Sequence, residues 1–486
     1  MKISNTTPKP ELYNFEVGGK YFVLHSSTGT LFEVDKKTYD FCRFVAELGW
    51  SDARERFVME YSESDWDSLI NEIKSDESLR RVFFEAKPPV KPYLGIMKSK
   101  ISSLSLNVME DCNFACVYCY GDGGTYHTPN TRMSPEVGKK AIDLLMREGK
   151  KVVNLQFFGG EPLLNFPLIR ELVHYAKGKA EEYGKTVTFS ITTNGYLITD
   201  KVIDFFLENN FTVTLSFDGP REVQNYNRPL RGGFPTFDVV AKNARKMLER
   251  GVKVSVRATI LPEQIGRYYE IYRFFVDFGF RSVHLEPATT STPLTKEHAK
   301  LIESALEKIA KDELEHYKEK GIVYTKLREM VHMIYSGTYR HYPCGVARSY
   351  FGVSADGKMY PCHRFVGMGE FVVGHVDDFR WENEFIQKIL RHTVDRRPNC
   401  SNCPIRAYCG GGCIYNNHYY NGDIFLPDEF HCSYMFALVK WGSWLYSNLD
   451  EDWLNKVFSR SPQSGVRAEE TNEAKTQKPK EVMESV

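Results

Sequence analysis

Six strand-like segments alternate with helical segments between residues 103 and 287, and this alternation constrains the fold more than any other feature. The strand-like segments are residues 103–108, 153–157, 187–192, 212–217, 252–259 and 282–286, and helical patterns cover 135–148, 167–182 and 201–209. Strands that alternate with helices pair in parallel, because each helix carries the chain back to the same end of the sheet. We therefore predict an α/β fold with a parallel sheet, open or barrel-like.

Cysteine, glycine and polar motifs follow four of these strands. A run of three cysteines follows the first strand, and residues 159–162 (Gly-Gly-Glu-Pro) follow the second. Residues 192–195 (Thr-Thr-Asn-Gly) close the third strand, and 216–219 (Ser-Phe-Asp-Gly) end the fourth. Ligands of parallel sheets bind at the carboxyl ends of the strands, where loops and helix N-termini converge. All four motifs are therefore expected at one binding site.

The three cysteines are Cys112, Cys116 and Cys119, in the spacing C-x3-C-x2-C. Three thiolates this close can ligate three irons of a 4Fe-4S cluster and leave the fourth iron without a protein ligand. A structural zinc site uses four ligands, and a disulfide uses two. Chance burial of three cysteines is the alternative, and the Gly-Gly-Glu-Pro motif after the next strand argues against it. The open iron indicates chemistry at this loop.

With the aromatic Tyr118 before its last cysteine, this loop resembles the signature of radical S-adenosylmethionine (SAM) enzymes. The resemblance implies a partial (β/α)6 barrel in which the amino and carboxylate groups of SAM chelate the open iron. It also implies contacts to the SAM amino group from the second motif, in which Glu161 supplies an acceptor and the glycines allow close approach. That motif comprises Gly159, Gly160, Glu161 and Pro162. Taken alone, it could also be an ordinary turn.

Weaker candidates for contacts to the SAM ribose and carboxylate are Asn194, Ser216 and Asp218. Each can equally be a capping residue at a strand end. Arg257 places a charge on a largely apolar strand and so needs a partner, for which the SAM carboxylate is a candidate.

Seven more cysteines follow a long charged helical stretch at residues 296–320: Cys344, Cys362, Cys400, Cys403, Cys409, Cys413 and Cys432. Their order and spacing closely resemble the SPASM extension of radical SAM enzymes, which carries two auxiliary 4Fe-4S clusters. The resemblance assigns Cys400, Cys403, Cys409 and Cys432 to one cluster, and Cys344, Cys362 and Cys413 to the other. A zinc ribbon is the alternative, and it would leave several thiols without a metal.

Two fully protein-ligated auxiliary clusters need eight thiolates, and this region provides seven. Relatives that fill the gap do so with a cysteine a few residues after the first, whereas residues 345–350 contain none. His363 or Tyr350 could cap the remaining iron. Otherwise the iron is open to a substrate cysteine, because a metal deprotonates a coordinated thiol. Cys42 lies far away in the sequence and is expected in a hydrophobic core.

The N-terminal residues predict a small separate unit. Residues 21–25 and 30–34 form a hairpin, Asp35 caps a helix, and two amphipathic helices follow near 53–61 and 65–74. Prolines at 88, 89 and 92 indicate a linker. This pattern resembles the winged-helix leader-recognition domains fused to peptide-modifying enzymes, in which an extended peptide would add to a sheet edge. A structural cap is the alternative.

The length, composition and net charge of the chain limit the class of protein. With 486 residues and 42% hydrophobic content, the chain can form two or three domains. Its zero formal net charge indicates no nucleic-acid or anionic-membrane partner. No apolar run reaches the ~18 residues of a membrane span, and no secretory segment follows the first residues, so we expect a cytoplasmic protein. Clustered cysteines in such a chain are metal ligands rather than disulfides.

Four segments are expected: a winged-helix-like peptide-recognition domain with its linker at 1–95, the radical SAM partial barrel at 96–320, the cysteine-rich SPASM domain at 321–455, and a tail at 456–486. The tail is charged and poor in apolar residues beyond 461, so it should be disordered.

The resemblance implies an anaerobic enzyme with SAM, three 4Fe-4S clusters, and reduced flavodoxin or ferredoxin as electron donor. Cleaved SAM gives a radical that abstracts hydrogen from a bound substrate. Enzymes of this architecture form thioether links in ribosomally made peptides (sactipeptides and ranthipeptides), form carbon–carbon links or decarboxylate peptides, or oxidise a sulfatase cysteine or serine to formylglycine.

The residue after Cys362 bears on this choice. The formylglycine class typically has an aspartate there, acting as a base, whereas this chain has His363. At this position the chain looks closer to the six-cysteine peptide (SCIFF) thioether maturases. We therefore predict a thioether-forming maturase of a precursor peptide with a leader. A non-enzymatic electron-transfer protein would not need an open iron beside Gly-Gly-Glu-Pro.

Overall fold

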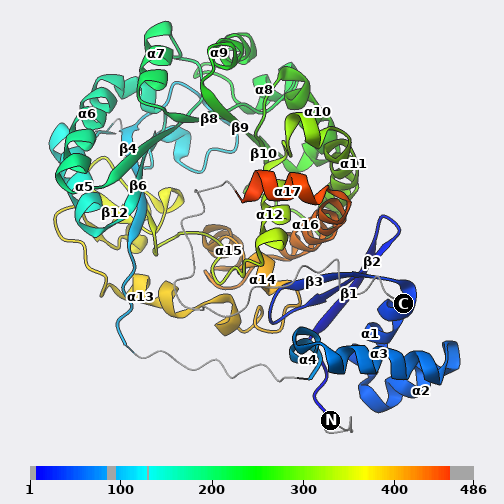
Figure 1. Ribbon diagram of the computed structural model, residues 1–486. Helices are drawn as coiled ribbons and strands as arrows, with labels where there is room; N and C mark the ends of the chain where they lie inside the picture. The colour runs from blue at the N-terminus through cyan, green and yellow to red at the C-terminus, as the bar shows by residue number, and fades with distance from the viewer. Residues whose placement is uncertain (1–6, 85–94, 128–130, 460–486) are drawn as a thin grey trace.

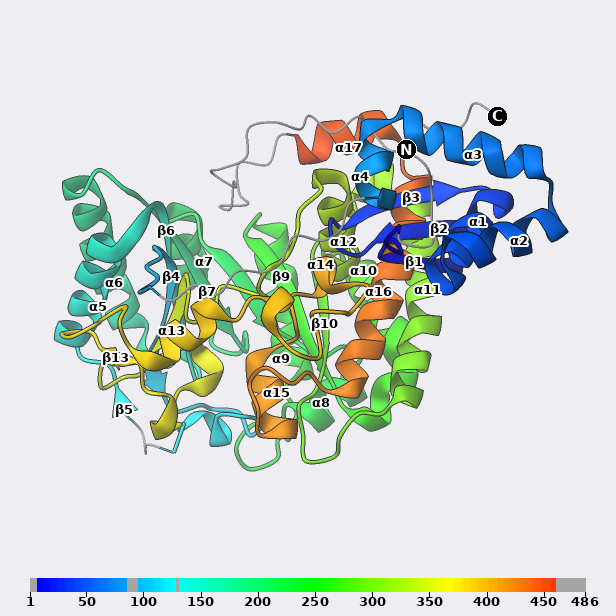
Figure 2. The same cartoon turned by 90° about the horizontal axis from the view of Figure 1, so that it is seen from below.

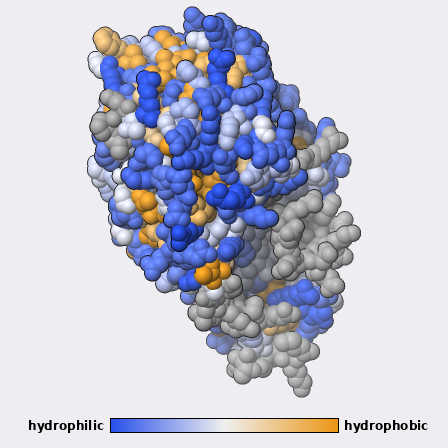
Figure 3. Space-filling view, turned by 90° about the vertical axis from the view of Figure 1, so that its left-hand side faces the viewer, coloured by the Kyte–Doolittle hydropathy of each residue, from blue (hydrophilic) through white to orange (hydrophobic). Residues whose placement is uncertain are grey.

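The computed structural model describes residues 7–84, 95–127 and 131–459. The expected proline linker and most of the expected tail lie outside these residues. Within them, no helix combines the length and the apolar character needed to cross a lipid bilayer. Figure 3 shows the side of the molecule that carries α5 and α6 as mostly hydrophilic, with smaller hydrophobic areas between.

Six parallel strands form the core of the molecule, in the order of the chain, as predicted. They are β4 (Ile101–Glu110), β6 (Gly149–Gly159), β7 (Thr186–Thr193), β8 (Thr212–Ser216), β9 (Lys253–Ile260) and β10 (Val283–Pro287). Helices cover the outer side of this curved sheet (Figure 1). They are α5 (Pro135–Glu148), α6 (Phe166–Glu182), α7 (Asp200–Glu208), α8 (Arg221–Asn227), α9 (Phe237–Glu249), α10 (Tyr268–Phe278) and α11 (Lys296–Lys320). The fold is the expected α/β partial barrel.

Alternate residues of the strands face the helices and the interior of the barrel, which we call the lumen. On β9, Val254, Val256 and Ala258 are buried against the helices, whereas Ser255, Arg257 and Thr259 between them are more exposed. This period of two is the geometry of a strand with two unlike faces. The lumen side is polar, which suits a binding site rather than a packed core.

The cysteine-rich segment extends the same sheet, which the sequence did not reveal. Strand β11 (Tyr350–Val353) pairs in parallel with β4, opposite Ser103 to Leu106. Strands β12 (Lys358–Tyr360) and β13 (Gly374–His375) continue antiparallel from it, and β5 (Thr131–Arg132) pairs with the end of β4. The cysteines that flank β11 are therefore fixed relative to the first strand of the barrel.

The remaining helices of the second half of the chain pack against α11 and the open side of the barrel (Figures 1 and 2). They are α12 (Thr325–Ser336), α13 (Glu384–Arg391), α14 (Arg406–Cys409), α15 (Ile414–Asn421), α16 (Glu429–Asn448) and α17 (Glu451–Phe458). Short 3-10 turns are η1 (Asp122–Gly124), η2 (Pro162–Asn165), η3 (Pro262–Arg267), η4 (His363–Phe365), η5 (Gly369–Phe371) and η6 (Val394–Arg396). Helix α17 continues past 456, where the disordered tail was expected to begin.

The N-terminal residues form a separate three-stranded antiparallel sheet: β1 (Leu12–Val17), β2 (Lys20–His25) and β3 (Thr30–Val34). Helices α1 (Lys36–Leu48), α2 (Trp50–Glu60), α3 (Glu63–Ser75) and α4 (Glu77–Phe84) follow. Asp35 caps α1 as predicted, accepting the Thr38 N–H at 2.7 Å. Strand β1 and helix α4 were not predicted. Cys42 is buried among the apolar residues of the helices, as expected.

One face of this small sheet packs on its own helices, and the other packs on the rest of the chain. Val23 belongs to the core of the helices, whereas Phe22 and Leu24 belong to the large core that includes α16. Gly18 lies so close to α16 that a Cβ there would be 2.3 Å from the indole nitrogen of Trp444. The sheet is thus held between two cores.

Candidate functional site

The loop from Cys112 to Cys119, here the iron loop, leaves the carboxyl end of β4 and is anchored by the segment that follows α8. The Ala115 N–H donates to the Pro229 carbonyl at 2.8 Å, and the Val117 N–H donates to the Asn227 carbonyl at 3.0 Å. These bonds hold the backbone between the cysteines, leaving the thiols to face inward from a fixed loop.

The thiols of the iron loop are close enough to affect one another. Burial, followed by the charge of Glu161, raises the pKa of Cys112, and Cys116 and Cys119 add to that increase. Burial also raises the pKa of Cys116 to about 11. Among the described residues, no three Cys, His, Asp or Glu side chains gather as the ligands of a single metal ion would. The three thiols nevertheless lie close enough to act on one another, and thiols are the donors that an iron–sulfur cluster uses.

The Gly-Gly-Glu-Pro segment at the end of β6 lies directly against the chain that leads into the iron loop. The Gly160 N–H donates to the Met109 carbonyl and the Glu161 N–H to the Asp111 carbonyl, both at 2.9 Å. A Cβ on Gly160 would be 2.2 Å from the Asp111 oxygen and 2.9 Å from the Gly124 oxygen. Only glycine permits this contact between backbones.

Glu161 is fully buried and joins the ends of two strands. Its carboxylate accepts the Thr193 hydroxyl at 2.8 Å and the Asn194 N–H at 2.8 Å on β7, and the Leu163 N–H at 3.0 Å on its own turn. Burial raises its pKa to about 7, although these bonds act in the opposite direction. These bonds connect the Gly-Gly-Glu-Pro segment to the end of β7, and the contact of Glu161 with the SAM amino group stays a prediction.

Asn194 supports the iron loop in the same way. Its side-chain amide donates to the Asn113 side chain at 2.8 Å and lies 3.8 Å from the Cys112 sulfur, while its own oxygen accepts the Tyr196 N–H. These contacts place Asn194 beside Cys112 of the iron loop. Its predicted contact with the SAM ribose stays a prediction. Ser216, at the end of β8, is partly exposed on the lumen side.

A buried ion pair that the sequence did not reveal lies beside Cys116. Arg228 Nε donates to Asp218 at 2.9 Å, and Arg228 Nη1 lies 3.9 Å from the Cys116 sulfur. Asp218 also accepts the Tyr118 hydroxyl at 2.5 Å and the Thr259 N–H at 2.9 Å. Asp218 is fully buried, so the structure gives it an internal role instead of the expected ligand contact. Arg228 was missed because no local pattern marks a contact across more than a hundred residues.

Arg257 lies on the lumen face of β9, between β8 and β10. Its Cα is opposite Ser216 on one side and His284 on the other, and its side chain is exposed. On β10, Glu286 binds His284 Nε2 and Lys326 Nζ, each at 2.6 Å. Burial, followed by the charge of Arg257, lowers the pKa of His363 to about 3. Arg257 therefore lies between the Glu286–His284 pair of β10 and His363.

The seven later cysteines fall into the two groups that the resemblance implies. Burial raises the pKa of Cys344 to about 11, with Cys413 the next cause, and Cys413 and Cys344 both act on Cys362. The second group is Cys400, Cys403, Cys409 and Cys432, whose charges act on one another in the same way. His431 lies 3.6 Å from the Cys409 sulfur. These groupings supply three and four thiols to the expected auxiliary clusters.

The two residues offered as caps for the three-thiol group bind each other. The Tyr350 hydroxyl lies 2.6 Å from His363 Nδ1 and also donates to the Gln156 side-chain oxygen at 3.1 Å. Arg364 instead approaches the thiols, with its Nη1 3.9 Å from the Cys413 sulfur.

Aromatic contacts connect the iron loop to the three-thiol group. The ring of Tyr120, next to Cys119, lies 6.3 Å from that of His363 and 6.1 Å from that of Tyr415. The Arg364 guanidinium lies over the Tyr120 ring at 5.4 Å. Tyr120 thus lies between the iron loop and the three-thiol group. Burial raises its pKa, and the charges of Cys119 and Cys362 both add to that increase.

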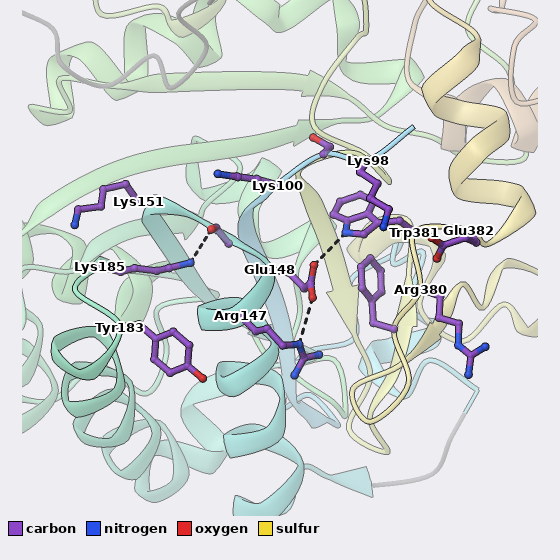
Figure 4. Close-up of a pocket in the computed structure, with 13 residues that line it drawn as sticks. Lys98, Lys100, Arg147, Glu148, Lys151, Tyr183, Lys185, Arg380, Trp381 and Glu382 are labelled. Atoms are coloured by element: carbon purple, nitrogen blue, oxygen red, sulfur yellow. Dashed lines mark hydrogen bonds and ion pairs between the residues drawn. The ribbon is translucent and has the colours of Figure 1, made fainter. Parts of the chain in front are cut away.

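A basic depression of about 640 Å³ lies at the opposite ends of the strands (Figure 4). Its cations include Lys151 and Lys185, but these bind the carbonyls of Gly184 and Gly149 at the ends of α6 and α5. Cations at helix C-termini stabilise the helix. The depression is remote from every thiol of the site and is explained by these local contacts.

Comparison with known proteins places two family models on this chain. The radical SAM superfamily matches residues 106–275, and an iron–sulfur cluster-binding domain named SPASM matches residues 344–404. A cysteine-type anaerobic sulfatase-maturating enzyme of Clostridium novyi is 26% identical over 341 residues, covering 66% of this chain and 89% of the relative. The radical SAM cyclopropyl synthase TigE of Paramaledivibacter caminithermalis is 24% identical over 452 residues, covering 86% and 91%.

Solved structures show the same fold. The enzyme anSMEcpe with bound AdoMet superposes with a TM-score of 0.61 at 20% identity, covering 71% of this chain and 98% of its own. Streptococcus suis SuiB bound to the precursor peptide SuiA superposes with a TM-score of 0.50 at 15% identity, covering 88% and 99%. The second likeness extends over more of this chain than the first.

Proposed function

We propose that this chain, a radical SAM enzyme with a SPASM domain, installs a thioether crosslink between a cysteine sulfur and a carbon of a ribosomally made precursor peptide. The observation that carries the proposal is the three-thiol group of Cys344, Cys362 and Cys413, which Tyr120 connects to the iron loop. A cluster held there has one iron without a protein thiolate.

The residues of the iron loop have separate tasks. Cys112, Cys116 and Cys119 would hold the first 4Fe-4S cluster, and the backbone of Gly159 and Gly160 packs against the chain that leads into this loop. Arg228 is the cation next to Cys116 and is the better candidate for the SAM carboxylate than Arg257, which is not among the charges that act on these thiols. When bound, SAM and the reduced cluster supply the radical that removes a hydrogen atom from the substrate.

The second site completes the bond. His363 Nδ1 contacts the Tyr350 hydroxyl, which leaves Nε2 of the same ring as a potential ligand, so the proposal of an open iron rests on the count of three thiols in this group. Cys344, Cys362 and Cys413 would hold a cluster that, when bound, would supply a position for a deprotonated cysteine thiolate of the peptide and an acceptor for the electron released on thioether formation. Cys400, Cys403, Cys409 and Cys432 hold the third cluster, and reduced flavodoxin or ferredoxin supplies electrons.

The N-terminal sheet is proposed to receive the leader of the peptide at an edge strand, where backbone hydrogen bonds give affinity. The sheet also contacts the cysteine-rich segment, because the Tyr408 hydroxyl donates to the Gly29 carbonyl at 2.7 Å. The relatedness to a solved complex with a precursor peptide supports a peptide substrate. Proline substitutions in the leader should weaken binding more than single changes of surface charge.

The test is spectroscopic. A cysteine-bearing substrate peptide should change the electron paramagnetic resonance signal of the auxiliary clusters, and the same peptide with Cys→Ser should not. If both peptides are shown to bind and give the same spectra, the thioether proposal is contradicted.

Two other reactions remain as the second candidates. The cyclopropyl synthase relative spans most of both chains, which favours carbon–carbon bond formation. The sulfatase-maturating relatives favour formylglycine formation, for which His363 would have to replace the expected aspartate base. Mass spectrometry of the modified peptide separates the three outcomes, because only the thioether consumes the cysteine thiol while retaining its sulfur in a crosslink.

A further inference from the structure

Arg257, on the lumen face of β9, makes no ion pair within the described residues, although Glu286 on the neighbouring strand lies close enough for the two charges to interact. Four charged side chains face this space near the auxiliary thiols: Arg257, Glu286, Lys326 and Arg364. Glu286 is bound by Lys326 at 2.6 Å, and Arg364 binds the Asn416 side chain at 2.5 Å next to Cys413. Arg257 makes no ion pair or hydrogen bond with its side chain within the described part of the chain, and it remains exposed.

The Arg257 side chain projects into the lumen rather than toward the helices that cover the sheet. Val256 and Ala258, its neighbours on β9, are fully buried against the helices, so the Arg257 side chain projects from the other face, into the lumen. An arginine projecting into a lumen needs a partner. Arg257 is not among the charges that act on Cys112 or Cys116, so we infer a partner other than SAM.

We propose that Arg257 binds a carboxylate of the peptide substrate and so selects peptides that carry an aspartate or glutamate next to the reacting residues. The proposal rests on the proposed function in one respect, that a peptide enters the lumen. The planar guanidinium can accept a carboxylate through two parallel hydrogen bonds. Ser216 and His284 flank Arg257 in the sheet and add polar groups around the same position.

The neighbouring charge also limits the class of ligand. Glu286 lies one strand away, and Lys326 and then His284 hold the pKa of Glu286 well below its usual range, although burial acts to raise it. Glu286 is therefore a carboxylate near neutral pH. A doubly charged phosphate would be repelled by it more strongly than a singly charged carboxylate. An uncharged asparagine or glutamine would leave Arg257 without a counter-ion.

The test uses three short synthetic peptides without cysteine, bound anaerobically to the reconstituted enzyme with SAM and measured by ligand-observed NMR titration. The first is acetyl-Gly-Asp-Gly-amide, and the second has Asn in place of Asp. The third is the Asn peptide with a free C-terminal carboxylate, which separates a terminal carboxylate from a side-chain one. Because none contains a thiol, the result does not depend on thioether chemistry.

We expect wild-type enzyme to bind the Asp peptide about tenfold or more tightly than the Asn peptide, since hydrogen bonds to charged groups are the stronger ones. Arg257→Gln should remove this preference, and Arg257→Lys should retain part of it. Lys253→Gln is the matched control: it removes a cation from the same strand, where Lys253 binds the Asn210 side chain. It should leave the preference unchanged.

Affinity for SAM is measured on the same variants. A loss of SAM affinity of about tenfold in Arg257→Gln would show that Arg257 binds the SAM carboxylate and would overturn the proposal. Equal binding of the Asp and Asn peptides to the wild type, or no binding of either at about 50 mM, would overturn it too. A carboxylate preference alongside unchanged auxiliary-cluster spectra would leave this inference standing while removing the thioether reaction.

Discussion

Replacing Gly160 by alanine tests the contact between the two loops that form the site. The new Cβ would lie 2.2 Å from the Asp111 oxygen, 2.5 Å from its carbonyl carbon and 2.9 Å from the Gly124 oxygen. All three are backbone atoms, so no side-chain rotation relieves the overlap. An ordinary contact between such atoms is about 3.5 Å, and the chain leading into the iron loop must therefore retreat by about 1 Å.

That displacement has a predictable cost. Overpacking of this kind destabilises by about 1–3 kcal/mol, and a misplacement of about 1 Å can lower a rate a hundredfold. We expect Gly160→Ala to form 5′-deoxyadenosine about a hundred times more slowly than the wild type in an anaerobic assay with dithionite and SAM. Iron bound to the auxiliary thiols should be unaffected.

Gly178→Ala is the matched control, because a Cβ at Gly178 in α6 meets nothing within 4 Å. Alanine in a helix interior is favoured over glycine by about 0.5–1 kcal/mol, so this variant should unfold at a slightly higher temperature and cleave SAM normally. If Gly160→Ala cleaved SAM within about threefold of Gly178→Ala, the backbone contact would not position the iron loop.

Three further predictions concern the cluster, the buried ion pair and the N-terminal sheet. Replacing all three cysteines of the iron loop by alanine should abolish 5′-deoxyadenosine formation and lower the iron content from about twelve to about eight atoms per chain; residual SAM cleavage would remove the central assignment. Asp218→Asn leaves Arg228 buried without a counter-ion, and denaturant titration should show a loss of about 3–5 kcal/mol. Burial lowers the pKa of His25 to about 4, so protons bind the unfolded chain more tightly than the folded one below pH 6.5. The contribution of His25 to the free energy of unfolding is therefore fully present above that pH, and the free energy of unfolding should fall by about 1 kcal/mol as the pH drops to about 5.5. His25→Gln should flatten this dependence.

Elements whose signals are local were predicted well. Helix α5 spans Pro135–Glu148 as expected, because Ser134 caps it and Pro135 occupies its first turn. The helical stretch at 296–320 is α11 with the same bounds. The strands of the barrel follow from runs of β-branched and aromatic residues with a period of two.

Elements that exist through distant partners were not predicted. Strand β11 has four residues and pairs with β4, some 245 residues earlier in the chain. Arg228 pairs with Asp218 ten residues earlier, but its contact with the Cys116 sulfur joins residues 112 positions apart, which no local pattern marks. The internal roles of Glu161 and Asp218 were missed for the same reason, because a sequence shows that a carboxylate follows a strand but not which donors surround it.

The pairing of β11 with β4 fixes the distance between two sets of thiols. One strand leads to the iron loop and the other is flanked by Cys344 and Cys362, so hydrogen bonds within a sheet, rather than flexible loops, fix the gap between the two sets of thiols. Under the proposed function, a bound peptide has to span that gap. Inserting residues between the cysteine and the reacting residue of the peptide should therefore move the crosslink to another carbon. The sheet fixes the distance between the two reacting groups, whatever the number of residues between them.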